Sequence, residues 1–272
     1  MHLSEHKPDK SLSAYIKCYR IIDFEFNHND PIPSKAYTPR PEHCLQFFQT
    51  PTKIEYPTSK DFIKPRNALL FGQHTVVNMR TVYKRFRSLQ IVFKPGALCK
   101  LLGIPTVDLT NSSVDAELIL GREIEEVNDQ LFHTSNHREM LSIADQYILK
   151  KLRAIKGNLD QIDLVAGEML NFNRSLDYYV SNGFLSQRQF NRRFIDSVGI
   201  SPKAFLRVAR FDYAYRLKNV FPAMNWFNVA IDSGYYDYQH LSKDYKSFTG
   251  LSPSDFFAMD SPERQLGTEE IY

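Results

Sequence analysis

The feature that most constrains the fold is an internal repeat near the C-terminus. The segment GISPKAF at residues 199–205 recurs as GLSPSDF at residues 250–256, an offset of 51, and further upstream the offset becomes 50. In each copy a short helix with apolar periodicity leads through a turn to a second helix, and a Ser-Pro pair opens the next one. Ser is a favoured N-cap, and Pro fits the first helical position because its missing N–H has no partner there. The repeat therefore predicts two copies of a helix-turn-helix.

The second helix of each copy is predicted to present a polar outer face. Phe190 and Phe194 are four residues apart and face inward, while Ser186 and Gln189 form a capping box and Asp237 caps the later helix. Arg, Asn and Gln side chains can read G and A edges, and Lys and Ser reach phosphates. A solvated helix face is the simpler alternative, but two capped, acid-poor copies at matched spacing favour double-stranded DNA as the partner. The outward residues are Gln187, Arg188, Asn191 and Arg192 in the first copy, and Tyr238, Gln239, His240, Ser242 and Lys243 in the second.

Residues 175–257 resemble the DNA-binding domain of AraC/XylS-type transcriptional regulators. The second copy carries most of that signature: Val229, Ala230, Gly234, Tyr235, Leu241, Tyr245, Phe248, Gly250, Ser252, Pro253 and Phe256. The resemblance implies a bacterial, sequence-specific transcription factor in which a long helix, here residues 203–220, joins the two units. It also implies that both second helices enter consecutive major grooves, about 34 Å apart, where eight of the nine outward residues, all but Gln187, would read bases. Val180 stands where the family usually has a small residue, which predicts weaker reading by the first unit.

The first hundred residues have a sequence pattern typical of strands and turns rather than of helices. Short apolar runs at 44–48 and 68–71, and the alternation at 88–93, predict strands, and residues 97–102 predict a short helix ending at Gly103. Residues 91–105 resemble a segment of N-terminal domains in many bacterial members of the family, which implies a strand-rich, distantly cupin-like sensor or dimerisation module. The predicted fold class is thus an α+β N-terminal domain followed by an all-α C-terminal domain with two helix-turn-helix units. The predicted divisions are an N-terminal domain at 1–135, a helical linker at 136–158, the DNA-binding domain at 159–262 and a flexible tail at 263–272.

Three patterns in the N-terminal part leave alternatives open. The amphipathic stripes at 114–131 and 138–155 predict helices that pack on their own domain or form a homodimer seam. The basic run at 60–100, with Asp61 as its one acid, fits a solvated sheet face, a second DNA contact or a pocket for an anionic ligand. A set of aromatic residues fits either an apolar pocket or plain core: Tyr37, Phe47, Phe48, Tyr56, Phe71 and Phe93.

Composition and motif spacing argue against other chemistry. The net charge of +3 is too small to indicate a nucleic-acid binder by itself. His28, His43 and His74 lack metal-ligand spacing, and no catalytic motif is present, so we predict no enzyme, no metal and no cofactor. No signal peptide or membrane span is predicted, which places the chain in the cytoplasm. The cysteines are scattered without C-x-x-C spacing, as suits a reducing compartment: Cys18, Cys44 and Cys99.

The sequence thus predicts a DNA-binding transcriptional regulator, an activator that works with RNA polymerase under the control of a small-molecule effector. A homodimer stays open. The alternative is a small-molecule-binding or enzymatic barrel whose helical domain binds only other proteins. The two differ in salt dependence, because a reader of DNA grooves loses affinity steeply as salt rises.

Overall fold

The strand-rich part consists of two antiparallel sheets that face each other. The computed structural model describes residues 2–25, 34–56, 66–155 and 158–259; the predicted tail at 263–272, His28, Lys60 and Lys64 lie outside these ranges. The larger sheet has the order β1 (His2–His6), β2 (Ile16–Glu25), β8 (Arg85–Phe93), β4 (His43–Phe48), β6 (Ala68–Phe71) and β9 (Ser113–Asp115). The smaller sheet has the order β3 (Ser34–Tyr37), β7 (Asn78–Thr81) and β5 (Lys53–Glu55).

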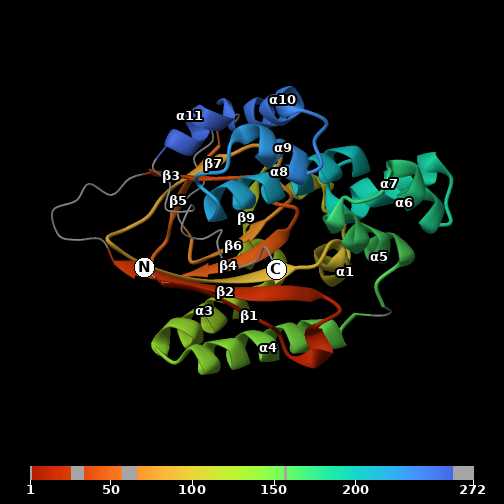
Figure 1. Cartoon of the computed structure of the whole chain (residues 1–272). Coiled ribbons are helices and arrows are strands. Elements are labelled where there is room, and N and C mark those ends of the chain that lie inside the picture. Colours follow the sequence, from red (N-terminus) through yellow and green to blue (C-terminus); the bar gives the residue numbers. More distant parts are fainter. Residues whose placement is uncertain (1, 26–33, 57–65, 156–157, 260–272) are drawn as a thin grey trace.

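An apolar cluster fills the space between the two sheets. Ile22, Phe48 and Phe86 from the larger sheet meet Ile54 from the smaller one. Figure 1 places the smaller sheet above the larger one, on the side of α10 and α11. The strand-rich N-terminal prediction is confirmed, and β4, β6 and β8 contain the three predicted strand segments.

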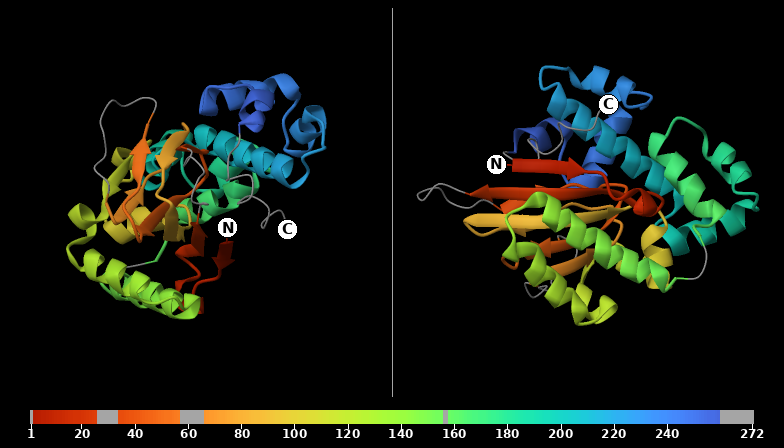
Figure 2. Two further views of the ribbon diagram at one scale, coloured as in Figure 1. Left: turned by 90° about the vertical axis from the view of Figure 1, so that its left-hand side faces the viewer. Right: turned by 90° about the horizontal axis from the view of Figure 1, so that it is seen from below.

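Two helices cover the other face of the larger sheet. Helix α3 (Glu123–His133) packs against α4 (His137–Arg153), and Met140, Ala144 and Ile148 of α4 join the same buried cluster as Tyr19 and Ile91. The helix predicted as the main part of a linker is therefore a layer of the N-terminal part, because its apolar stripe covers the sheet (Figures 1 and 2). Of the two alternatives for this stripe, the structure shows packing on its own domain.

The prediction of one helix over 114–131 is wrong. The segment forms β9, in which Val114 pairs with Leu70, followed by α2 (Ala116–Leu120) and then α3. Gly121 separates the two helices with a φ of 87°, a backbone conformation that side chains disfavour. The short helix predicted at the end of the strand-rich zone is confirmed as α1 (Ala97–Leu102), which ends at Gly103. Two 3-10 turns complete this part: η1 (Lys10–Leu12) and η2 (Val107–Leu109).

The C-terminal part is helical and is organised around one long helix. Phe205 and Phe211 of α8 pack with Phe194, Tyr245 and other aromatic rings of the neighbouring helices. In Figures 1 and 2 α8 runs between α6 and α7 at one end and α9 to α11 at the other. The predicted joining helix and the all-α C-terminal class are confirmed. The elements are α5 (Gln161–Glu168), η3 (Met169–Asn171), α6 (Leu176–Asn182), α7 (Gln187–Val198), α8 (Pro202–Val220), α9 (Trp226–Asp232), α10 (Tyr238–Thr249) and α11 (Pro253–Ala258).

The two parts share a buried core. Ala36 of β3 and Val77, just before β7, belong to the apolar cluster of the helical part. The backbone N–H of Val77 also donates to the carbonyl of Phe248 at 2.8 Å. The smaller sheet is thus packed directly on α10.

Candidate nucleic-acid interface

Each predicted recognition helix begins at a side-chain cap. In α7 the hydroxyl of Ser186 accepts from the N–H of Gln189, and the Gln189 side chain accepts from the N–H of Ser186, a capping box. In α10 an oxygen of Asp237 accepts from the N–H of His240 at 2.8 Å. These caps confirm the predicted helix starts and fix which residues stand in the first turn, where helices present N–H groups and a partial positive charge.

The outer face of α7 presents two arginines to solvent. Arg188 and Arg192 are exposed, and among the described residues neither takes part in an ion pair. On the opposite side Phe190 and Phe194 are completely buried and stack at 5.8 Å between ring centroids. The structure therefore brings the four predicted residues of this unit to one solvent-facing surface: Gln187, Arg188, Asn191 and Arg192.

The outer face of α10 is more mixed. Gln239, His240 and Lys243 are exposed, whereas Tyr238 and Ser242 are half-buried. Tyr238 also packs against the helical core, which limits how far its ring can project. Of the five predicted residues the structure thus brings three to the solvent-facing side of α10, with Tyr238 and Ser242 at its margin, at the other end of α8 from the α7 surface.

Helices α7 and α10 each contain one carboxylate, and α10 turns its own away from the outer face. Asp244 is buried and accepts from Nε and Nη2 of Arg207 on α8 at 2.9 and 2.7 Å, and from the Tyr235 hydroxyl at 3.2 Å. Burial and the neighbouring Asp244 raise the pKa of Tyr235, so its hydroxyl stays a proton donor. The Asp244 carboxylate thus holds α10 against α8 and is removed from the outer face, where Asp237 at the N-cap lies 2.8 Å from the ring of His240.

Two exposed aromatic residues were missed by the sequence analysis. Phe184 and Tyr236 stand in the turns of the two units and are 85% and 86% exposed. Phe184 also has a φ of 52°, which is uncommon for a residue other than Gly, Asn or Asp. Both could have been noticed in the sequence, because each is an aromatic residue in a predicted turn, where burial in the core is not expected.

The C-terminal ends of α7 and α10 are held by the N-terminal part. We call these contacts the interdomain clamp; they are made by Val77, Thr106 and Thr110. The N–H of Thr106 donates to the carbonyl of Asp196 at 2.8 Å, and its hydroxyl donates to the carbonyl of Ser197 at 2.9 Å. The Thr110 hydroxyl donates to the carbonyl of Gly199 at 2.7 Å. Together with the bond from Val77 to α10, these contacts satisfy carbonyls that helix ends leave unpaired.

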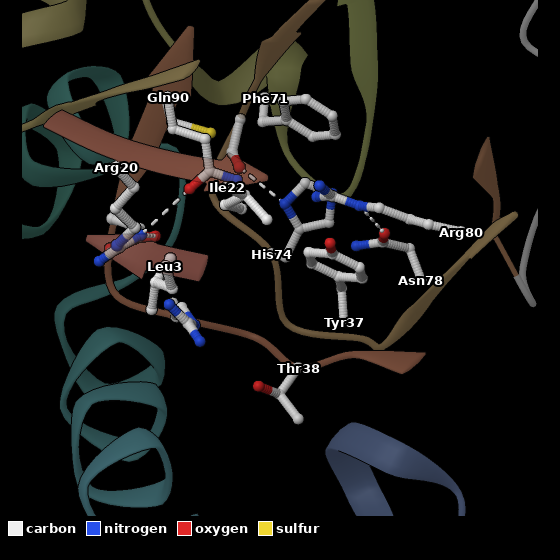
Figure 3. A pocket seen from close by; sticks show the side chains of 14 residues that line it. Leu3, Arg20, Ile22, Tyr37, Thr38, Phe71, His74, Asn78, Arg80 and Gln90 are labelled. Carbon is white, nitrogen blue, oxygen red and sulfur yellow. Dashed lines mark hydrogen bonds and ion pairs between the residues drawn. The ribbon is translucent and has the colours of Figure 1, made fainter. Parts of the chain in front are cut away.

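A small cavity lies inside the N-terminal part, with a volume of about 60 Å³. Figure 3 shows Arg80 and Asn78 on one side of it and Arg20 on the other, with His74 between them. Of the predicted aromatic set, Tyr37 and Phe71 line this cavity, whereas Phe47, Phe48 and Phe93 are core. Tyr56 stacks on His74 and its hydroxyl lies 2.9 Å from the ring Nε2.

The solvated-face interpretation of the basic run fails at two residues. Arg80 and Arg87 are each only 6% exposed, Arg80 beside the cavity and Arg87 near Met140 and Phe132. A run of basic residues does not indicate which of them are buried, and here the guanidinium groups of Arg80 and Arg87 lie against aromatic rings inside the fold.

The described ranges also bear on metal sites, membrane-spanning helices and reactive cysteines. No group of three or more His, Cys, Asp or Glu side chains gathers there in a way that could hold a metal ion. No helix of the described chain is long and apolar enough to span a bilayer. Burial raises the pKa of Cys18 and Cys44 to about 12, which keeps both thiols protonated at neutral pH.

Two family models match the chain, one in each part. The model described as a helix-turn-helix domain (HTH_18) matches residues 183–259. A model described as a domain of unknown function (DUF6597) matches residues 4–115. No curated protein matches the sequence.

Several solved structures cover most of the chain at low identity. Unsaturated fatty acid-bound wild-type ToxT from Vibrio cholerae is 10% identical, with a TM-score of 0.48, over 93% of this chain and 97% of that one. An apo variant of ToxT from the same organism is 10% identical, with a TM-score of 0.48, over 93% and 99%. The AraC-like transcriptional activator CuxR is 13% identical, with a TM-score of 0.27, over 91% and 88%.

The family match and the structure agree over the helical part. Residues 183–259 match the helix-turn-helix family model, and the same residues form α7, α8, α9, α10 and α11 with the caps and the joining helix that the signature predicts. Residues 183–259 therefore form a helix-turn-helix domain of the kind found in AraC/XylS-type DNA-binding transcriptional regulators.

Proposed function

We propose that the protein activates transcription by placing α7 and α10 in consecutive major grooves of its operator. The observation that carries the proposal is the pair of capped helices at the two ends of α8, whose first two turns expose Arg, Asn, Gln and Lys side chains and no carboxylate. Arg188, Asn191 and Arg192 supply the donors and acceptors that read G and A in the first block, and Gln239 and Lys243 do so in the second. The half-buried Tyr238 and Ser242 serve as packing and phosphate contacts.

We further propose that the N-terminal part, residues 1–155, binds a small-molecule effector and transmits its presence through the shared core. The cavity beside Arg80 supports an effector site, and the interdomain clamp supports a route to both recognition helices. RNA polymerase is the proposed partner in activation, and the site of action is the cytoplasm. The protonated, buried cysteines favour a regulator without catalysis.

The test is to select genomic fragments that stay bound to the protein at physiological salt and then to measure affinity for the enriched site. Two short blocks about ten base pairs apart are expected. Replacing Lys243 by Ala weakens binding by about 1–3 kcal/mol and lowers the salt slope by about one, and replacing Arg192 by Ala has its effect on the first block. Arg122→Ala, at a highly exposed residue of the N-terminal part, is the control and leaves affinity unchanged.

The competing function is a barrel whose helical domain binds only other proteins. In that case the protein has no salt-dependent DNA affinity, and Lys243→Ala and Arg122→Ala behave alike. A single enriched block, insensitive to Arg192→Ala, would remove the first unit from base reading and contradict the two-groove mechanism.

A further inference from the structure

Two buried arginines, Arg20 and Arg80, line opposite walls of the cavity between the sheets. The guanidinium of Arg80 on β7 lies between two aromatic rings, 3.7 Å from the centroid of Tyr37 and 4.4 Å from that of Phe71. Its Nε donates to the side chain of Asn78 at 2.9 Å and its Nη1 to that of Gln46 at 2.9 Å. These contacts fix the plane of the guanidinium, and Nη2 takes part in no hydrogen bond between described residues.

Arg80 is only 6% exposed, yet no carboxylate of a described residue lies within 4.0 Å of it. Both hydrogen-bond partners are neutral amides. The charge of Arg20, on the opposite wall, is by contrast balanced by ion pairs with Glu5 and Glu42. A buried charge without a counter-ion is costly, and proteins retain such groups chiefly where something else supplies the opposite charge.

The neighbouring histidine does not supply that charge. Burial, with a contribution from the charge of Arg80, lowers the pKa of His74 to about 3, so the ring is neutral at physiological pH. Its two nitrogens are already engaged, Nδ1 at 2.8 Å from the carbonyl of Gly72 and Nε2 at 2.9 Å from the Tyr56 hydroxyl. The cavity therefore offers a guanidinium with unused donors next to a neutral, fixed wall.

We infer that this cavity binds a small organic carboxylate, held by the guanidinium of Arg80. The inference rests on the proposed effector function of the N-terminal part and names the chemical class of the effector. A planar guanidinium fork matches the two oxygens of a carboxylate. The volume of about 60 Å³ has room for on the order of four waters, which selects a compact acid rather than a long-chain one.

The position of the cavity suits a regulatory ligand. Arg40 also lines it, and Nε of Arg40 lies 3.9 Å from an oxygen of Asp212 on α8. Asp212 in turn is paired with Arg216, one helical turn further along α8, at 2.6 Å. A carboxylate in the cavity lies beside an ion pair that joins the N-terminal part to the helix between the two DNA-binding units.

The experiment measures thermal unfolding of the full-length protein, without DNA, against rising acetate, pyruvate and succinate. Sodium chloride at equal ionic strength and acetamide, the uncharged counterpart of acetate, are the controls. At least one carboxylate is expected to raise Tm in a saturable way, with one site by calorimetry. Arg80→Met is expected to abolish this response, and Arg85→Met, at an exposed residue of β8, to keep it.

Two results would overturn the inference. One is the lack of a saturable response to all three acids, and the other is an equal response in Arg80→Met and the parent protein. If Arg80→Met does not fold, Arg80→Lys keeps the charge but loses the planar fork, and at least a tenfold weaker Kd is expected, whereas an unchanged Kd contradicts the assignment. Since no DNA is present, failure here leaves the DNA-binding tests unaffected, and the reverse also holds.

Discussion

Replacing Thr106 by Val tests the interdomain clamp at its most buried point. The Thr106 side chain is completely buried, and its hydroxyl donates to the carbonyl of Ser197 at 2.9 Å. Val has nearly the same shape but cannot donate, so the Ser197 carbonyl at the end of α7 loses this bond. The backbone bond from Thr106 to Asp196 persists. A buried polar group left without a partner costs about 1–3 kcal/mol, and that is the expected loss in the free energy of unfolding.

Urea unfolding followed by circular dichroism measures the effect. The midpoint is expected to fall while the slope with urea stays constant, since the folded structure buries the same surface. Thr81→Val is the matched control, because its hydroxyl makes a solvent-exposed contact with Ser34 at 3.1 Å at the end of β7, and a change within about 0.5 kcal/mol is expected. An unfolding free energy for Thr106→Val equal to that of the control would refute the reasoning that this hydroxyl holds α7 to the N-terminal part.

Three other predictions concern strain, pH and the fastening of α10. Phe184→Gly is expected to stabilise the protein by about 1 kcal/mol, seen as a higher Tm, because Phe184 is exposed and its φ of 52° is strained; a lower Tm would contradict this. Burial lowers the pKa of His43 to about 4 and of His74 to about 3. Both rings are neutral when folded, so their stabilising effect is present above about pH 6.5 and is lost as pH falls towards 4. Each histidine is expected to lower the free energy of unfolding by about 2 kcal/mol between pH 7 and pH 5, as measured by urea unfolding at each pH. His43→Gln is expected to make the free energy of unfolding less dependent on pH, and an unchanged pH dependence would count against the assignment. Asp244→Asn is expected to lower stability by about 1–2 kcal/mol, a modest value because its partner Arg207 is 40% exposed, and a Tm equal to that of the parent would show that the pair contributes nothing.

The sequence predicted the helical part in detail because its signals are local. The Ser186 capping box, the Ser-Pro helix starts and the four-residue spacing of Phe190 and Phe194 each act within one or two turns of a helix. The nine outward residues follow from the same periodicity, and their role in reading DNA stays a prediction. The burial of Asp244 could not be predicted from that periodicity, because its partners Arg207 and Tyr235 lie outside α10.

The N-terminal part was predicted only in outline because its contacts are long-range. The alternation in β8 was visible, but the pairing of Val114 with Leu70 is not a local property, and a helix was assigned there instead. The cavity could not be placed at all. Arg80 belongs to a run of basic residues that looked solvated, and only the packing of Tyr37 and Phe71 on its two sides shows that it is buried.

The shared core has a consequence for engineering. Ala36 and Val77 are strand residues by position, yet they pack among the helices of the DNA-binding part. A chimaera that exchanged the N-terminal part for that of a distant relative would replace two residues of the other domain's core and the backbone donor to Phe248. The strand-rich and helical parts of this protein are therefore not interchangeable, and an exchange is expected to succeed only when the smaller sheet is kept together with the helices on which it packs.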